Sequence, residues 1–449
     1  MKLVLLSLLI ALTQLNANAD SLSISDSTPL SLKEAHEYAV KNSASMKNAR
    51  IDASIAEKQI AETRAIGLPQ INASAEYQYY FEIPTSLIPA EFFGGQPGEF
   101  AEIQFGTEQN LSANLNVNQL IFDGSYFIGL RAAKIYRDIS NKNIEKSEID
   151  IKVSVSQTYY LALITQENIK ILQENLENMN KIYYETEKMF EAGFTDQINK
   201  EQLILAVSRL KNTLSNLKRQ EKLTNNLLKF QIGMDMQTDL ELTDDLTELI
   251  KQINLETVKS ENFNHENHID YKIVKSYEYM QEMNFKRERS AYWPKISGNY
   301  VYQQSAMRNE FNFLDSEESW FPTSFFGVSI SIPIFSSGMK NSRVQQAKLE
   351  LNKAKISTQQ TSSSIQLQME EARAEFNTAM EKYQNDKENL ELANKILKRT
   401  NIMHKEGLAS SLELTQANDQ LLETQGSYLQ AIFELLNAKN ELDKALGRL

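Results

Sequence analysis

The most constraining feature of this sequence is an internal repeat, in which one pattern of residues occurs twice. Matching residues recur at a spacing of 225 in the first part of each copy and of 214 in the second, in the pairs Pro69 and Pro294, Tyr77 and Tyr302, Gly193 and Gly407, and Gly233 and Gly447. Each copy reads as a helix, two strands and a long helical hairpin. We therefore expect two structural repeats, over residues 20–233 and 256–449, joined by an irregular linker over residues 234–255.

The N-terminus has the pattern of a secretory signal peptide over residues 1–19. Lys2 precedes a short apolar run, and Ala17-Asn18-Ala19 has the small residues of a cleavage site. The alternative, a membrane anchor, needs roughly 20 apolar residues, which this run does not reach. The absence of cysteine excludes disulfides, thiol catalysis and an N-terminal lipid anchor. A net charge of −12 argues against a nucleic-acid partner.

Long helices account for most of the chain. The pattern predicts helices over 32–66, 125–192 and 196–232 in the first copy, and over 269–292, 339–406 and 410–446 in the second. At about 1.5 Å per residue, the longest would reach roughly 100 Å. Apolar residues recur at alternating spacings of three and four from Ala372 to Leu397 and from Leu414 to Leu442, which predicts the seam of a coiled coil.

Four segments alternate apolar and polar residues with period two, which predicts strands over 70–81, 111–122, 295–303 and 324–335. A half-buried strand of a soluble sandwich would show this pattern. Tilted strands of about 9–11 residues with one apolar face are also typical of outer-membrane barrels. We favour the barrel, with these residues facing lipid: Ile71, Tyr77, Tyr79, Leu115, Val117, Tyr300, Val328, Ile330 and Ile332. Four strands cannot close a barrel, so copies must pool their strands, and two or three copies would serve.

The doubled layout and its joints resemble the outer-membrane efflux and secretion channel family typified by TolC. The resemblance covers essentially the whole mature chain and rests on Leu68-Pro69-x-Ile71, Leu120-Ile121-Phe122-Asp123-Gly124, Pro333-Ile334-Phe335-x-x-Gly338 and the hairpin glycines Gly193 and Gly407. It implies a mainly helical protein with a membrane β-barrel. Four strands per protomer would form a twelve-stranded trimeric barrel, and twelve long coiled-coil helices a periplasmic tunnel.

The family resemblance also implies a function. The homotrimer would be a passive export channel in the outer membrane, without lipid anchor, cofactor or enzymatic activity. It would connect a periplasmic membrane-fusion adaptor and an inner-membrane pump of RND or ABC type to the exterior, for efflux of small toxic molecules or type I secretion. An alternative from the residues is a trimeric coiled-coil envelope protein or adhesin anchored by a barrel. Helices that fold back beside every strand pair favour the channel.

The resemblance places sites at the hairpin tips. It implies that Gly193-Phe194 and Gly407-Leu408 dock adaptor hairpins, although both glycines would equally serve as helix C-caps. It aligns Glu413, Gln416 and Asn199 with acidic gate positions, of which only Glu413 keeps a charge, and Ala409 with an arginine that can hold the gate shut. Asp196, Lys200 and Glu201 are other candidates for holding the gate closed. For each residue the alternative is a solvated helix face.

No catalytic motif stands out in the sequence. His265 and His268 have the spacing of metal ligands on one helix face, but the first copy has no counterpart, and helix entry is the interpretation we favour. No phosphate-binding loop or nucleophile elbow occurs. The sequence therefore predicts no catalytic, cofactor or metal site, and it leaves the exported substrate open.

Overall fold

The computed structural model describes residues 28–251, 253 and 263–449, so the predicted signal peptide and part of the linker lie outside the described residues. The chain forms two compact units. The helical unit comprises Met1–Ser43, Ser154–Leu255 and Ala379–Asn437, and the sheet unit comprises Ala44–Val153, Glu256–Thr378 and Ala438–Leu449. Each unit takes segments from both halves of the sequence, so the two halves are not separate globular domains.

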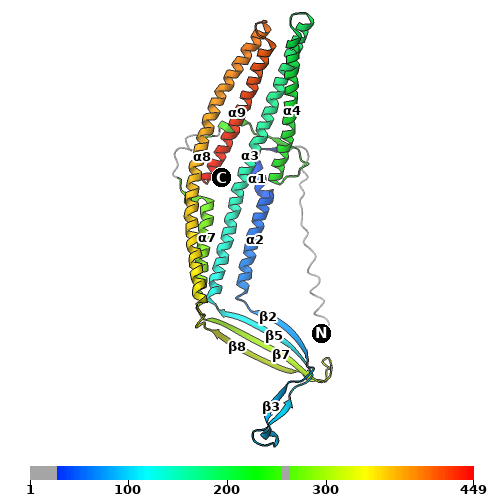
Figure 1. Cartoon of the computed structure of the whole chain (residues 1–449), viewed down its shortest axis with the longest axis vertical. Coiled ribbons are helices and arrows are strands. Elements are labelled where there is room, and N and C mark those ends of the chain that lie inside the picture. The colour runs from blue at the N-terminus through cyan, green and yellow to red at the C-terminus, as the bar shows by residue number, and fades with distance from the viewer. Residues whose placement is uncertain (1–27, 252, 254–262) are drawn as a thin grey trace. The chain divides into compact units, whose positions relative to one another are not determined.

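The long elements occur in the same order in both halves (Figure 1). The first half contains α1 (Leu32–Asn42), α2 (Ala44–Ala65), β2 (Gln70–Tyr79), β5 (Gln109–Phe122), α3 (Gly124–Glu191) and α4 (Gln197–Ile232). The second contains α7 (Ile269–Ser290), β7 (Lys295–Arg308), β8 (Phe321–Ser331), α8 (Met339–Lys405) and α9 (Ser411–Ala445). The shorter elements are β1 (Thr28–Leu30), β3 (Thr85–Pro89), η1 (Ala90–Phe93), β4 (Phe100–Gln104), β6 (Leu240–Leu242), α5 (Leu246–Lys251) and η2 (His265–Asn267).

The sheet unit contains one four-stranded antiparallel sheet in the order β2-β5-β7-β8 (Figure 1). Its register aligns one row of side chains across all four strands, namely Ile71, Val117, Tyr300 and Phe326. Because side chains alternate between faces, these residues share a face with the other predicted apolar positions of each strand. The apolar face is exposed, and large side chains such as Ile71, Val328 and Ile330 have most of their surface uncovered.

Several strand ends differ from the prediction. β2 ends at Tyr79, and β7 continues beyond Gln303 to Arg308, because Arg308 still pairs with Gln109 of the long strand β5. β8 ends at Ser331, so Ile332 lies after the strand. Pro333 follows closely, and a proline has no amide hydrogen with which to continue a ladder.

Residues 82–110, between the predicted strands 70–81 and 111–122, contain ordered structure of their own. β3 and β4 pair as an antiparallel hairpin with η1 at its turn. In Figure 1 this hairpin extends from the end of the sheet at which β2 finishes and β5 begins. The prolines and glycines of this segment lie mostly between the two short strands, where they form the turn.

The helix predicted over residues 32–66 is broken at Ser43, and the single-helix prediction was wrong there. Ser43 is extended, with φ −60° and ψ 147°, and it separates α1 from α2. Gly233, with φ +76° after the end of α4, approaches this break so closely that a Cβ would lie 2.6 Å from the Asn42 carbonyl oxygen. The close approach requires glycine.

The predicted linker also has regular structure in its described part. β6 pairs in parallel with β1 near the N-terminus, and α5 follows it. Asp244, between β6 and α5, accepts hydrogen bonds from the Leu32 amide (2.6 Å) and the Tyr159 hydroxyl (2.8 Å). The linker is therefore hydrogen-bonded to α1 and α3 inside the helical unit.

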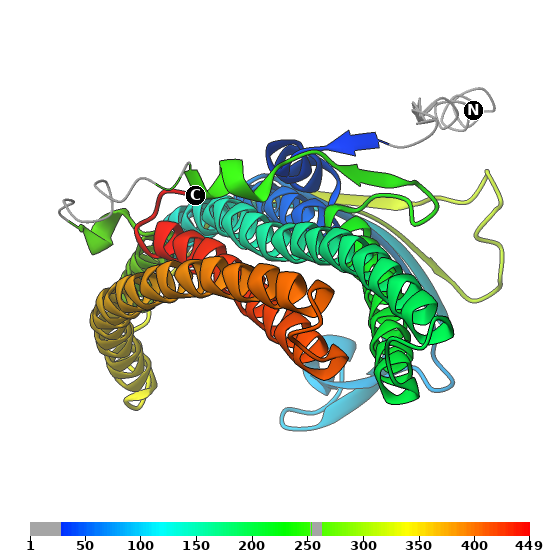
Figure 2. The same ribbon diagram turned by 90° about the horizontal axis from the view of Figure 1, so that it is seen from above.

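In the helical unit, hairpin α3–α4 lies beside hairpin α8–α9 (Figure 2). The first hairpin has an apolar core made by Leu172, Met179, Leu203, Ala206, Val207 and Leu210. In the second, the predicted seam is buried at Ala393, Leu414, Leu421 and Leu435, and the rings of Tyr383 and Tyr428 stack at 5.8 Å. Each hairpin therefore has packing of its own.

Among the described residues, no helix combines the length and apolar character needed to cross a membrane.

Candidate functional site

The two hairpin turns, which the sequence singled out, have closely similar backbone geometry. Gly193 and Gly407 have φ +78° and +75°. The amide of Phe194 donates to the Met189 carbonyl, and that of Leu408 donates to the Met403 carbonyl, both at 2.8 Å. These are glycine C-caps in which the left-handed residue closes the helix end. The C-cap interpretation of both glycines is therefore confirmed.

Each glycine is followed by a large apolar side chain that stands in solvent. Phe194 is 81% exposed and Leu408 is 70% exposed. Ile198 and Leu412, in the first turns of α4 and α9, are also exposed. Exposed apolar side chains grouped at the turns of both hairpins make a surface suited to contact with another protein.

Glu413 has a local structural role that the sequence interpretation missed. Its carboxylate accepts hydrogen bonds from the Ser410 amide (2.7 Å) and hydroxyl (3.0 Å), and the Ser410 hydroxyl accepts from the Glu413 amide (3.2 Å). This is a capping box at the start of α9. The hydrogen bonds from Ser410 lower the pKa of Glu413. The Ser-x-x-Glu spacing before α9 was a signal for this role.

Asn199 connects the two tips. Its Oδ1 accepts a hydrogen bond from the Ser411 amide of the other hairpin (3.3 Å), and its Nδ2 donates to the Thr195 hydroxyl (3.1 Å). Nε2 of His404 lies 3.3 Å from the Ser411 hydroxyl. Burial lowers the pKa of His404, against a smaller opposite effect of Glu185. These side chains border a cavity between the turns.

The other gate candidates make no described side-chain hydrogen bond or ion pair to the opposite hairpin. Lys200 pairs with Glu187 of its own hairpin at 2.8 Å, and Glu201 accepts a hydrogen bond from Gln197. Asp196 is the N-cap of α4 but makes no side-chain capping bond, and Gln416 is exposed. Of the residues singled out, only Asn199 has a described hydrogen bond to the opposite hairpin.

The two neighbouring histidines are placed as helix-entry residues. His268 is the N-cap of α7, and its Nδ1 accepts a hydrogen bond from the Asp270 amide (3.2 Å). The ring of His265 packs edge-on against Tyr271. In the part of the chain that the structure describes, no group of three or more histidine, aspartate or glutamate side chains is arranged to hold a metal ion.

An apolar-faced antiparallel sheet combined with two long helical hairpins defines the class of outer-membrane channel subunits. The family model "Outer membrane efflux protein" matches residues 36–233 and 281–448, one segment in each half. The chain belongs to the outer membrane efflux protein family. Its function is that of an export channel, as the resemblance implied, and the channel prediction is favoured over the adhesin alternative.

Solved structures show the same fold. CusC matches with a TM-score of 0.73 at 17% identity, covering 95% of both chains. The MtrE outer membrane channel of Neisseria gonorrhoeae, in its open state, matches with a TM-score of 0.70 at 18% identity, covering 93% of this chain and 88% of that one. The CmeC outer membrane channel of Campylobacter jejuni matches with a TM-score of 0.69 at 18% identity, covering 93% and 85%. The search of curated proteins found no match.

Proposed function

We propose that three copies of this chain form one closed outer-membrane channel that passively exports substrates delivered by a pump. The four-stranded sheet carries the proposal. Among the described strands, β2 and β8 each have a strand partner on one side only, and the sheet has an exposed apolar face. In lipid every backbone polar group needs a partner, and a membrane barrel needs at least about eight strands. Pooling strands between copies satisfies both conditions, and the family resemblance supports three copies.

We propose that residues 20–233 and 256–449 are two structural repeats. Their helices agree in length, with 68 residues in α3 against 67 in α8, 36 in α4 against 35 in α9, and 22 in both α2 and α7. The matching turns at Gly193 and Gly407 support the same pairing. A trimer would then present six similar hairpin tips around one rim.

The tips would dock a periplasmic adaptor, which in turn would recruit the inner-membrane pump. Exposed Phe194 and Leu408 at equivalent turns support this role. The helices would then lie in the periplasm and the loops with Gly94 and Trp320 outside the cell. Energy would come from the pump, because the channel itself has only to provide a continuous path.

A two-part experiment tests this function. The purified oligomer should conduct ions across a planar lipid bilayer without an energy source. Replacing Phe194 and Leu408 together by serine should leave that conductance unchanged but abolish pump-dependent efflux of a dye from cells. A wild-type oligomer that forms no pores would overturn the channel proposal. Efflux that survives the double replacement would overturn only the docking proposal.

Glu413 is proposed to line the narrow periplasmic end of the channel while it caps α9. Glu413→Gln removes the charge but keeps an oxygen that can accept the bonds from Ser410, as a glutamine does in capping boxes. We expect this variant to change single-channel conductance, or block by multivalent cations, with at most a small loss of thermal stability. Single-channel recordings and the thermal unfolding midpoint check the two effects.

Glu413→Ala is the matched comparison, because it removes both the charge and the cap. It should reproduce the electrical change and also lower the unfolding midpoint. Because the pKa of Glu413 is lowered in the folded protein, the cap stabilises above the unfolded-state pKa of about 4.3 and is lost as the pH falls through the folded-state value. Conductance that is unaltered in both variants would contradict the gate assignment.

A further inference from the structure

A cavity lies between the two hairpins of the helical unit, away from the tip cavity, and α3, α8 and α9 contribute its walls. The facing positions of α3 and α9 follow the four-three-four spacing of a coiled-coil seam, with Ile171, Asn175, Asn178 and Ile182 on α3 and Leu414, Asn418, Leu421 and Gln425 on α9. Half of these eight positions carry a carboxamide. Such a seam normally consists of apolar residues, so the amides need an explanation.

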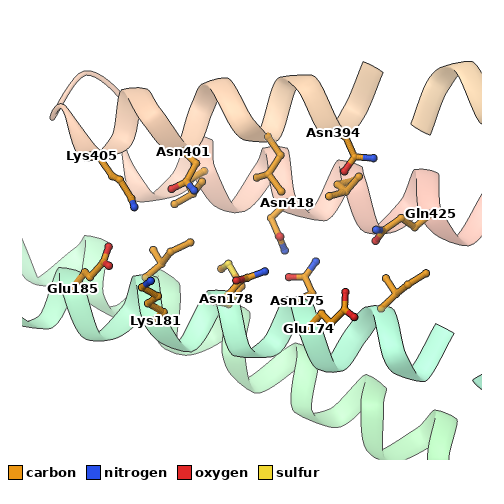
Figure 3. A pocket seen from close by; sticks show the side chains of 16 residues that line it. Glu174, Asn175, Asn178, Lys181, Glu185, Asn394, Asn401, Lys405, Asn418 and Gln425 are labelled. Atoms are coloured by element: carbon orange, nitrogen blue, oxygen red, sulfur yellow. The ribbon is translucent and has the colours of Figure 1, made fainter. Parts of the chain in front are cut away.

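Figure 3 shows Asn175 of α3 and Asn418 of α9 pointing toward one another across the cavity. Both are buried, with 8% and 3% of their surface exposed. The Oδ1 atom of Asn175 has no hydrogen-bond partner in the protein, and the same holds for Oδ1 of Asn401 and Oε1 of Gln425, which also line the cavity. Buried polar groups are nearly always hydrogen-bonded, so these oxygens require donors from a bound molecule.

The charges around the cavity indicate what kind of molecule fits. Glu174 and Glu185 line it together with Lys181 and Lys405, so its formal side-chain charge is balanced. The facing amides both donate and accept hydrogen bonds. A neutral molecule that does the same is favoured over an anion or a metal cation. Water meets this description, since a buried water makes two to four hydrogen bonds to polar partners.

We propose that this cavity binds water that bridges Asn175 to Asn418, and that the hydrated amide layer sets the register of the two hairpins at a cost in stability. A polar residue in a coiled-coil seam specifies register because a shifted alignment would bury it against apolar partners. Each hairpin keeps packing of its own, in the Leu172–Leu210 cluster and the Tyr383–Tyr428 stack. Because of the amide layer, the two hairpins separate from each other more easily than the helices within either hairpin do.

The test uses leucine, which has the same branched arrangement of four side-chain heavy atoms as asparagine but is bulkier and has no polar atoms. In the full-length oligomer, Asn175→Leu and Asn418→Leu should each leave the thermal unfolding midpoint unchanged or lower it, because each leaves the opposite amide without its hydrogen-bond partner. The double variant should raise the midpoint by a few degrees above wild type. Its effect would then differ from the sum of the two single effects, which shows that the two positions are coupled. Asn418→Ser, which keeps a hydrogen-bonding group and room for water, should stay near wild type.

The matched control pair is Asn180→Leu with Gln420→Leu, on the same two helices but exposed and outside the cavity lining. Its effects should be small and additive. If the effects of Asn175→Leu and Asn418→Leu are equally additive, the water-bridge proposal is overturned. If Asn418→Ser destabilises as much as Asn418→Leu, the proposal is overturned as well.

Only the separation of the hairpins rests on the proposed channel function. The double leucine variant should open less often than wild type in single-channel recordings, because an apolar seam resists separation. Unchanged opening together with a raised midpoint would overturn the separable-contact role and leave the water site standing. A wild-type protein that never conducts would instead overturn the channel function, while the coupling of the two asparagines could still be measured.

Discussion

Asp244→Ala is expected to destabilise the helical unit by about 1.5–3 kcal/mol, because hydrogen bonds to a charged group are strong and the part-buried Leu32 amide loses its acceptor. One carboxylate oxygen accepts from both the Leu32 amide and the Tyr159 hydroxyl, at 2.6 and 2.8 Å. Tyr159 is fully buried, and its hydroxyl is also 2.8 Å from the Leu30 carbonyl. Burial, and then the bond to Asp244, raise the pKa of Tyr159. Thermal unfolding followed by circular dichroism would measure the loss.

Related variants separate the hydrogen bonds from the charge. Asp239→Ala removes a charge from the same connecting segment at an exposed position and should have little effect. Asp244→Asn keeps one acceptor oxygen and should cost less than Asp244→Ala. Tyr159→Phe combined with Asp244→Ala should cost less than the sum of the two single changes, because the partners share one bond. Equal midpoints for Asp244→Ala and Asp239→Ala would contradict the role of Asp244.

Val328→Lys is expected to prevent stable insertion of the channel into the outer membrane. Val328 is exposed on the apolar face of β8, and a lysine at mid-depth on a lipid-facing strand costs about 2–4 kcal/mol in each chain. In a trimer the penalty applies three times. The amount of folded oligomer in the outer-membrane fraction, measured against wild type, checks this prediction.

Ser329→Lys is the matched control for the same strand. Ser329 is the next residue and lies on the opposite face, because successive strand side chains alternate. If that face lines a water-filled interior, this variant should insert normally and change only the conductance. Equal insertion of both variants would contradict the assignment of Val328 to lipid, and failure of Ser329→Lys alone would reverse the two faces.

Local patterns predicted most of the element types. Period-two alternation identified the four long strands, and the spacing of three and four identified the long helices, because each pattern reflects the geometry of one element alone. The positive φ at Gly193 and Gly407 could be foreseen for the same reason. The capping box of Ser410 and Glu413 was equally local and could have been recognised from its spacing.

Other features depended on residues that are distant in the sequence. The break at Ser43 is matched to Gly233, the end of β7 depends on pairing with Gln109, and Asn199 meets the amide of Ser411. No local period encodes such contacts, since they depend on which elements come to lie side by side. The helix pattern placed Asn175 and Asn418 on their helices without showing that they face each other.

The sequence by itself thus determined the repeat, the types of the long elements and the family to which the chain belongs. Only the tertiary structure decided which polar side chains pair across the hairpins, where the helices and strands end, and that Asn199 joins the tips. The physical reason is that secondary structure follows from hydrogen bonds and side-chain periods within one segment. The pairing of polar groups instead follows from how segments more than two hundred residues apart pack together.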